Sequence, residues 1–259
     1  MKILCLVVFA VGCANVETDG ESAFTPSAVE EVFDRDLVRE VELVITANDW
    51  GALQADTHEY VKGDLYFGTE TVTEVAIRYK GNSSFDSVPF PKKPFKVDLN
   101  RYVEGQELLG FRKLNFSNAL WDPSFLREAA GYDTFAAAGA PWSRSSHARL
   151  TVTVPGVYEH EVLGVYVMIE QVDKAYLERN FGSGEGNLYK ASFGFDTIWQ
   201  GSNPDLYQDI GAEKKTNEAE NDWSDIVELL DILNNTSDDE FPEEIEGILN
   251  VDGFLSYLA

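Results

Sequence analysis

Basic side chains gather in one stretch of this chain, where they could hold an anion. Between Ala76 and Arg127 there are nine basic residues and five acidic ones. The rest of the chain is strongly acidic, so this local surplus of cations indicates a local anion site. The alternative is that these cations only form ion pairs with acidic neighbours, a common use of surface charge. The nine basic residues are Arg78, Lys80, Lys92, Lys93, Lys96, Arg101, Arg112, Lys113 and Arg127.

The net charge argues against binding to nucleic acid. The 259-residue chain has 45 acidic and 20 basic side chains, a formal net charge of −25. Such a charge repels nucleic acid and anionic membranes at long range, so no nucleic-acid partner is expected. The hydrophobic fraction of 44% and the aromatic fraction of 12% predict a folded globular protein.

The histidines and cysteines predict no metal or redox site. His58, His147 and His160 are scattered and match no HExxH spacing. Cys5 lies inside an N-terminal apolar run and Cys13 at its end, so a mature chain without that run has no cysteine pair for a disulfide or for zinc. A glycosidase with paired carboxylates is a minor alternative, because 45 acidic residues offer many pairs.

The first residues have the charge order of a secretion signal. Lys2 precedes an apolar run that is too short to span a bilayer. Small residues before Cys13 resemble a bacterial lipobox, so residues 1–13 are predicted to be a lipoprotein signal peptide and Cys13 the lipid attachment site. An ordinary secretory signal or a buried start to the fold is the alternative. Residues 14–35 are expected to be a flexible tether. The signal peptide and the lipid together predict a domain that is anchored to a bacterial membrane outside the cytoplasm.

The residue patterns predict an α+β fold, with a β-rich half followed by a helical part. Hairpins are expected around Gly68–Glu70 and Pro155–Gly156. The strand at 94–102 is expected at a sheet edge, and Asp122 is expected to cap a helix over 122–141. The other predicted strands are 35–46, 60–68, 71–81, 108–118, 147–154 and 161–172. The other predicted helices are 47–56, 173–181, 223–234, 242–249 and 252–258.

Seven segments, in this order, resemble the CotH kinase family, which was first described among spore coat proteins. They are IRYKGNSSF (77–85), KKPFKVDLN (92–100), LLGFRKLNFSN (108–118), DPSFLREAAGYDTFAAAGAP (122–141), GVYVMIEQVDKAYLERNF (164–181), GNLYK (186–190) and VDGFLSYLA (251–259). The resemblance implies a diverged protein-kinase-like fold of two lobes within 36–259. The β-rich small lobe would cover about 36–170, and the helical lobe would start at about 171.

The resemblance also implies a nucleotide site. Phosphoryl transfer depends mainly on positioning and on cationic neutralisation of the phosphates. A small polar turn would bring its backbone N–H groups close to the phosphates, a strand lysine would contact them, and a helix glutamate would orient that lysine. A hinge would meet the adenine through its backbone. The implied residues are Lys80, Gly81, Ser83, Ser84, Lys96, Glu128, Glu170 and Gln171. Each has a structural alternative: an ordinary turn, a solvated lysine or a surface ion pair.

The resemblance implies ATP with Mg²⁺ or Mn²⁺, and a protein phosphoacceptor. The family's catalytic aspartate, followed by Asn-Tyr-Tyr, and its metal-binding Trp-Asp-x-Asp segment have no counterpart before Ala259. The catalytic residues are therefore expected beyond Ala259, no metal ligand is assigned, and the chain is expected to be a C-terminally truncated, inactive fragment. Two functions stay open: an atypical Ser/Thr kinase of extracytoplasmic proteins, or a non-catalytic surface lipoprotein that binds a protein or a glycan.

Overall fold

The computed structural model describes residues 10–11, 31–55, 58–81, 83–192 and 194–259. The chain forms two compact units. The barrel unit comprises Glu21–Thr134 and Trp142–Gln171, and the helical unit comprises Met1–Gly20, Phe135–Pro141 and Val172–Ala259. Strands and helices both contribute, so the predicted α+β class is confirmed. The kinase-like arrangement of two lobes stays a prediction.

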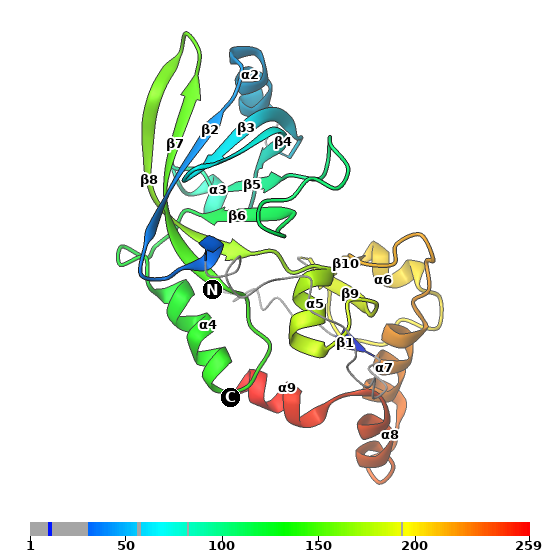
Figure 1. Cartoon of the computed structure of the whole chain (residues 1–259). Helices are drawn as coiled ribbons and strands as arrows, with labels where there is room; N and C mark the ends of the chain where they lie inside the picture. Colours follow the sequence, from blue (N-terminus) through cyan, green and yellow to red (C-terminus); the bar gives the residue numbers. More distant parts are fainter. Residues whose placement is uncertain (1–9, 12–30, 56–57, 82, 193) are drawn as a thin grey trace. The chain divides into compact units, whose positions relative to one another are not determined.

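Seven strands of the barrel unit close into a barrel in the order β2-β3-β4-β5-β6-β8-β7 (Figure 1). The pairing of β2 with β7 is parallel, and the other pairs are antiparallel. Because β5 lies between β4 and β6, the prediction of an edge strand at 94–102 is wrong, since both neighbours supply hydrogen bonds. The strands are β2 (Val38–Val44), β3 (Val61–Phe67), β4 (Glu70–Tyr79), β5 (Phe95–Asp98), β6 (Lys113–Ser117), β7 (Ser145–Val154) and β8 (Tyr158–Glu170).

Alternation along β4, β5 and β6 separates an apolar core from a polar face. Successive side chains of a strand point to opposite faces, so every second residue can be buried. Arg78, Lys96 and Asn115 lie opposite one another in register and share the polar face. The core-facing residues of these strands are at most 1% exposed: Ile77, Tyr79, Phe95, Val97, Leu114 and Phe116.

Three helices accompany the barrel strands: α2 (Ala47–Ala55), α3 (Ser83–Asp86) and α4 (Arg127–Ala137). Helix α4 begins five residues later than the predicted start at Asp122. Phe125 adopts a left-handed backbone conformation with a φ of 59°, which an α-helix does not accommodate. Gly139, with a φ of 72°, lies just beyond the end of α4.

The helical unit contains a three-stranded sheet and five helices within its described residues. Asp173 caps the first of these helices by accepting a hydrogen bond from the Ala175 N–H, and Gly182 ends it. The strands are β1 (Ala10–Val11), β9 (Asn187–Ala191) and β10 (Ala212–Lys214). The helices are α5 (Lys174–Phe181), α6 (Asp205–Asp209), α7 (Ser224–Asn235), α8 (Phe241–Ile248) and α9 (Val251–Leu258). The sequence predicted four of these helices but missed α6 and the sheet.

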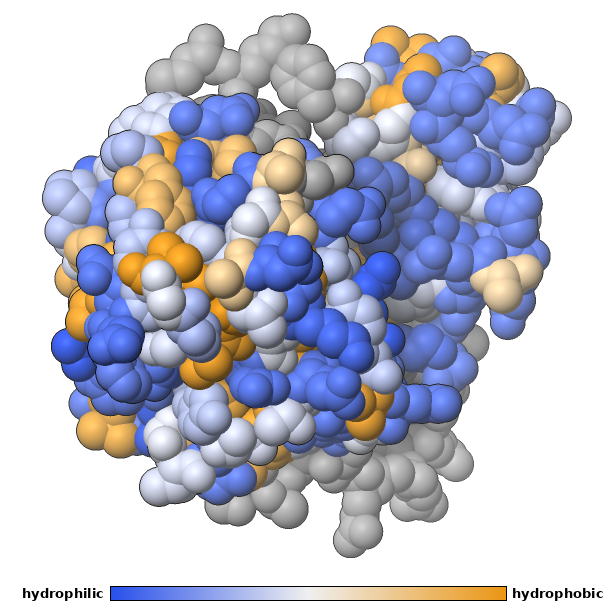
Figure 2. All heavy atoms as spheres, turned by 90° about the horizontal axis from the view of Figure 1, so that it is seen from above, coloured by the Kyte–Doolittle hydropathy of each residue, from blue (hydrophilic) through white to orange (hydrophobic). Residues whose placement is uncertain are grey.

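Exposed apolar side chains are scattered. On the face drawn in Figure 2, hydrophobic residues are interrupted by hydrophilic ones throughout. Single exposed apolar residues are normal for a folded protein and need no partner to explain them. Among the described residues, no helix combines the length and the hydropathy that crossing a membrane requires.

Candidate functional site

Four cations line the polar face of the barrel, and we call them the cationic row: Arg78, Lys80, Lys96 and Lys113. Lys96 on β5 lies directly opposite Arg78 on β4. The Lys80 N–H donates to the Pro94 carbonyl at 3.0 Å, which continues the pairing of β4 beyond its last residue. Since side chains two apart share a face, Lys80 and Lys113 lie on the same side of the sheet as Lys96. The row gathers residues from three neighbouring strands.

Lys96 is the central cation of this row. Burial lowers the pKa of its ammonium to about 8, and the positive charges of Lys113, Arg78 and Lys80 contribute to that lowering. The carboxylate of Asp98 lies 3.9 Å from the Lys113 ammonium. Within the described part of the chain, Lys96 itself forms no ion pair. Repulsion from like charges destabilises a partly buried cation, and a bound anion would offset that repulsion. The row therefore suits a multiply charged anion such as a phosphate.

Two other lysines of the basic stretch have structural roles. The Lys92 ammonium lies 3.7 Å from the centroid of the Tyr166 ring and donates to the Val165 carbonyl. The Lys93 ammonium lies 4.0 Å from the centroid of the Phe85 ring and donates to the Phe85 carbonyl at 2.6 Å. Cation–π contacts and backbone bonds hold both side chains in place. Six of the nine basic residues thus either form the cationic row or anchor the loop between β4 and β5.

A polar turn follows the cationic row directly. Gly81 has a φ of 80°, and a Cβ at this position would lie 2.1 Å from Ser84 Oγ, so the turn needs glycine. The turn leads into helix α3, whose first residues are Ser83, which is exposed, and Ser84, which is half-buried. Their hydroxyl groups form no hydrogen bond within the described residues. The sequence placed Gly81, Ser83 and Ser84 beside Lys80, and the structure keeps them at the end of β4 that carries Lys80.

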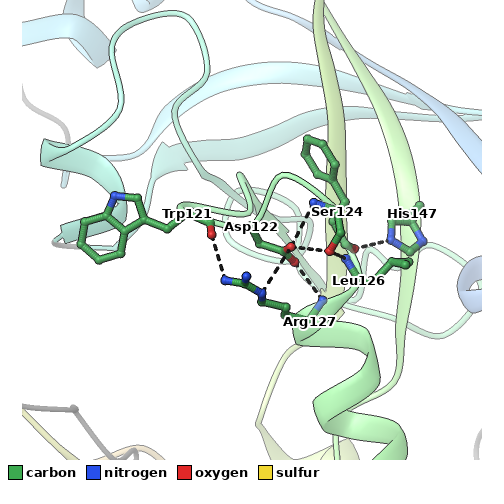
Figure 3. Close-up of polar contacts among 7 residues, drawn as sticks. Trp121, Asp122, Ser124, Leu126, Arg127 and His147 are labelled. Carbon is green, nitrogen blue, oxygen red and sulfur yellow. Dashed lines mark hydrogen bonds and ion pairs between the residues drawn. The ribbon is translucent and has the colours of Figure 1, made fainter.

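The loop between β6 and α4 has a strained backbone. Ala119, Trp121 and Phe125 have φ values of 53°, 59° and 59°, a left-handed conformation that is unfavourable for residues other than glycine. Such conformations persist where surrounding contacts over-determine them. The Trp121 side chain is 75% exposed, and in Figure 3 its indole points away from the polar contacts of the loop.

Asp122 supplies those contacts (Figure 3). Its buried carboxylate accepts hydrogen bonds from the Ser124 hydroxyl, the Ser124 N–H and, at 2.8 Å, the Arg127 N–H. The Ser124 bond, with the Arg127 contacts, lowers the pKa of Asp122. The Arg127 guanidinium donates to the Trp121 carbonyl at 3.0 Å. Asp122 thus accepts from the N–H of the first residue of α4, although it lies five residues before the helix and not at its start as predicted.

The side chains of Glu170 and Gln171, the predicted hinge residues, point in different directions. Glu170 is 4% exposed and accepts hydrogen bonds from the Arg144 N–H at 3.0 Å and from its guanidinium at 3.4 Å. It pairs with Leu114, a core residue, so its carboxylate faces the core and not the cationic row. Gln171 accepts from the Asn115 amide at 3.2 Å, and Asn115 lies opposite Lys96. The structure therefore brings Gln171 to the polar face.

Glu128 lies in the first turn of α4 and is half-buried. In the described part of the chain it forms no ion pair with a lysine, so orientation of a lysine by Glu128 stays a prediction. Cys13 lies outside the described residues. Among the described residues, no group of three or more His, Cys, Asp or Glu side chains could hold a metal ion. The described residues thus contain no ready-made metal site, whereas the cationic row suits phosphates.

The comparisons with known proteins identify a family. A family model described as CotH kinase protein matches residues 77–259, which is well over half of the chain. The match includes the cationic row, the polar turn and the strained loop. No curated protein matches the chain. On the strength of the family match, the chain belongs to the CotH kinase protein family.

Proposed function

We propose that this protein binds ATP through its phosphates at the cationic row and transfers the γ-phosphoryl group to Ser or Thr of an extracytoplasmic protein. The observation that carries the proposal is Lys96, a partly buried cation without an ion pair in the described part of the chain. The repulsion from the three other cations of the row outweighs the attraction of Asp98. The kinase-like function of the family supports the choice of ATP among polyphosphates.

Each residue of the site has a role in this proposal. Lys96, Arg78 and Lys80 neutralise the phosphate oxygens, which is the main protein contribution to phosphoryl transfer. The hydroxyls of Ser83 and Ser84 donate hydrogen bonds to the same oxygens. When ATP is bound, it supplies the phosphoryl group. No step of the proposal is assigned to a metal, because the described residues provide no ligand set for one.

The proposal places the protein outside the cytoplasm. The apolar run before Cys13 and the small residues around it support a lipoprotein signal. Lipidated Cys13 would hold the domain at a bacterial membrane, where the phosphoacceptor would be another secreted or surface protein. The contact with the membrane would be made through the lipid alone.

A transfer assay tests the proposal. The protein is incubated with γ-labelled ATP, Mg²⁺ or Mn²⁺ and casein as a Ser/Thr-rich acceptor. Label should enter casein with wild type and fall at least about tenfold with Lys96→Ala. Lys62→Ala is the matched control, because Lys62 is an exposed barrel lysine that pairs with Glu74 at 2.9 Å. Equal labelling by the Lys96→Ala and Lys62→Ala variants would contradict the site. ATP binding without any transfer would contradict the kinase and support a non-catalytic binding protein.

A further inference from the structure

The side chain of Asn118 joins the two ends of the loop between β4 and β5. Asn118 follows the last residue of β6 and is 5% exposed. Its amide nitrogen donates to the Ser84 carbonyl at 2.9 Å and to the Lys92 carbonyl at 3.0 Å. Ser84 belongs to the polar turn, and Lys92 belongs to the arm that returns to β5. One buried amide therefore fixes the spacing of both arms.

The returning arm is also held by contacts that do not involve Asn118. The Tyr166 hydroxyl donates to the Lys93 carbonyl at 3.0 Å. The Phe90 ring packs against Trp50, with 5.6 Å between the ring centroids. The returning arm is thus fixed to the barrel. Through Asn118, the turn that carries Ser84 is tied to this fixed arm.

The other half of the Asn118 amide is unsatisfied. Its Oδ1 atom is buried and has no hydrogen-bond partner among the residues that the structure describes. A buried acceptor without a partner is unfavourable, so Asn118 is a poor choice for stability alone. The two bonds of its nitrogen then explain why a polar residue occupies this position.

We propose that Asn118 is a positioning residue, which holds the polar turn at the distance from Lys96 that a polyphosphate needs to reach both. The inference rests on the proposed function. Asn115, three residues earlier on β6, lies opposite Lys96. The end of one strand thus supports both parts of the site. On this proposal a tripolyphosphate contacts the cationic row and the hydroxyls of Ser83 and Ser84 together, whereas orthophosphate contacts the row alone.

Two anions of different length test this inference. Calorimetric titrations measure the affinities of wild type, Asn118→Ala and Asn234→Ala for tripolyphosphate and for orthophosphate. Asn118→Ala should weaken tripolyphosphate binding at least about tenfold and change orthophosphate binding less than about twofold. Asn234 is the matched control: its amide also donates to two backbone carbonyls, of Thr197 and Leu230, both at 2.8 Å, but it lies in the helical unit. Asn234→Ala should change neither affinity.

The outcomes separate positioning from a merely structural role. An equal loss for both anions, or no loss for either, would overturn the positioning role while leaving the phosphate site intact. Wild type that binds neither anion would overturn the proposed function itself. Should Asn118→Ala fail to fold, NMR of wild type decides: tripolyphosphate should shift the side-chain amide signals of Asn118, and orthophosphate should not. Unshifted signals with saturating tripolyphosphate would overturn the inference.

Discussion

Lys96 on β5 lies directly opposite Arg78 on β4, so two cations face each other in register across an antiparallel pair. Like charges in this position destabilise a sheet. Burial adds to the conflict and, with the neighbouring cations, lowers the pKa of Lys96 to about 8. Groups that weaken the fold in this way are typical of functional sites, where selection retains them for what they bind.

Removal of the Lys96 charge should therefore stabilise the protein. Lys96→Met keeps the apolar stem and should raise the free energy of unfolding at pH 7 by about 1 kcal/mol or more, since one unit of pKa corresponds to about 1.4 kcal/mol. Urea titrations measure this difference. The same variant should lose anion binding.

The increase in the free energy of unfolding caused by Lys96→Met should depend on pH. The pKa of Lys96 is about 8 in the folded protein, against 10.5 as its ordinary value, so the unfolded chain binds more protons between these values. The destabilisation of the folded protein by the charged Lys96 ammonium is complete below pH 8 and decreases as the pH rises toward 10.5. The difference in free energy of unfolding between Lys96→Met and wild type should therefore become smaller over that range. Lys92→Met is the control, because Lys92 also has a pKa of about 8 but bonds the Val165 carbonyl and the Tyr166 ring. An equal increase in the free energy of unfolding for both variants would contradict the claim that neighbouring like charges destabilise Lys96.

Gly81→Ala should weaken both the fold and the site. Its φ of 80° is unfavourable for alanine, and a Cβ would lie 2.1 Å from Ser84 Oγ, so the Ser84 hydroxyl must rotate away. We expect a loss of about 1–2 kcal/mol in the free energy of unfolding and weaker tripolyphosphate binding. Gly105→Ala is the control, because Gly105 has a φ of 79° and, among the described residues, no atom lies within 4 Å of the position that a Cβ would take. Equal effects on tripolyphosphate affinity would show that backbone strain, and not the turn itself, is responsible.

The hairpins show what local sequence signals can predict. Gly68 and the Pro155–Gly156 pair mark turns between alternating segments, and β3–β4 and β7–β8 form there. The closure of the barrel had no such signal, because the parallel pairing of β2 with β7 joins Val38 to His147, residues far apart in sequence. Closure depends on strand number and tilt, which no single segment encodes.

The candidate site also contains residues that the sequence could predict and residues that it could not. Lys96 was predictable, because an isolated basic stretch in an acidic chain is visible in the sequence. Asn118 was not predictable, since its partners are backbone carbonyls, which every residue carries. Glu170 was predicted to meet the adenine through its backbone, and that stays a prediction, because the contact of its side chain with Arg144 was not visible in the sequence and does not test it.

Glu170→Gln should separate stability from binding. Loss of the buried carboxylate weakens its bonds with Arg144 and should lower the free energy of unfolding by about 1–3 kcal/mol. ATP affinity should stay within about twofold of wild type, because the side chain faces away from the cationic row. A loss of affinity as large as that of Lys96→Ala would place the Glu170 carboxylate in the site.

Cys13→Ser tests the proposed anchor. Wild type expressed in a bacterial host should partition into the detergent phase of a Triton X-114 extraction, because a lipidated cysteine gains affinity for apolar surroundings with each buried methylene. The variant should move to the aqueous phase. Cys5→Ser, a change inside the apolar run, is the control and should partition like wild type. Detergent partitioning that survives Cys13→Ser would exclude lipidation at this residue.

The central claim is that the cationic row around Lys96 binds the phosphates of a nucleotide, and a calorimetric titration with ATP tests it most directly. Wild type and Lys62→Ala should bind ATP with the same affinity. Lys96→Ala should bind it at least about tenfold more weakly, the equivalent of about 1.4 kcal/mol for a lost charge-assisted contact. If Lys96→Ala binds ATP as tightly as wild type, the phosphates bind elsewhere and the account of this site is wrong.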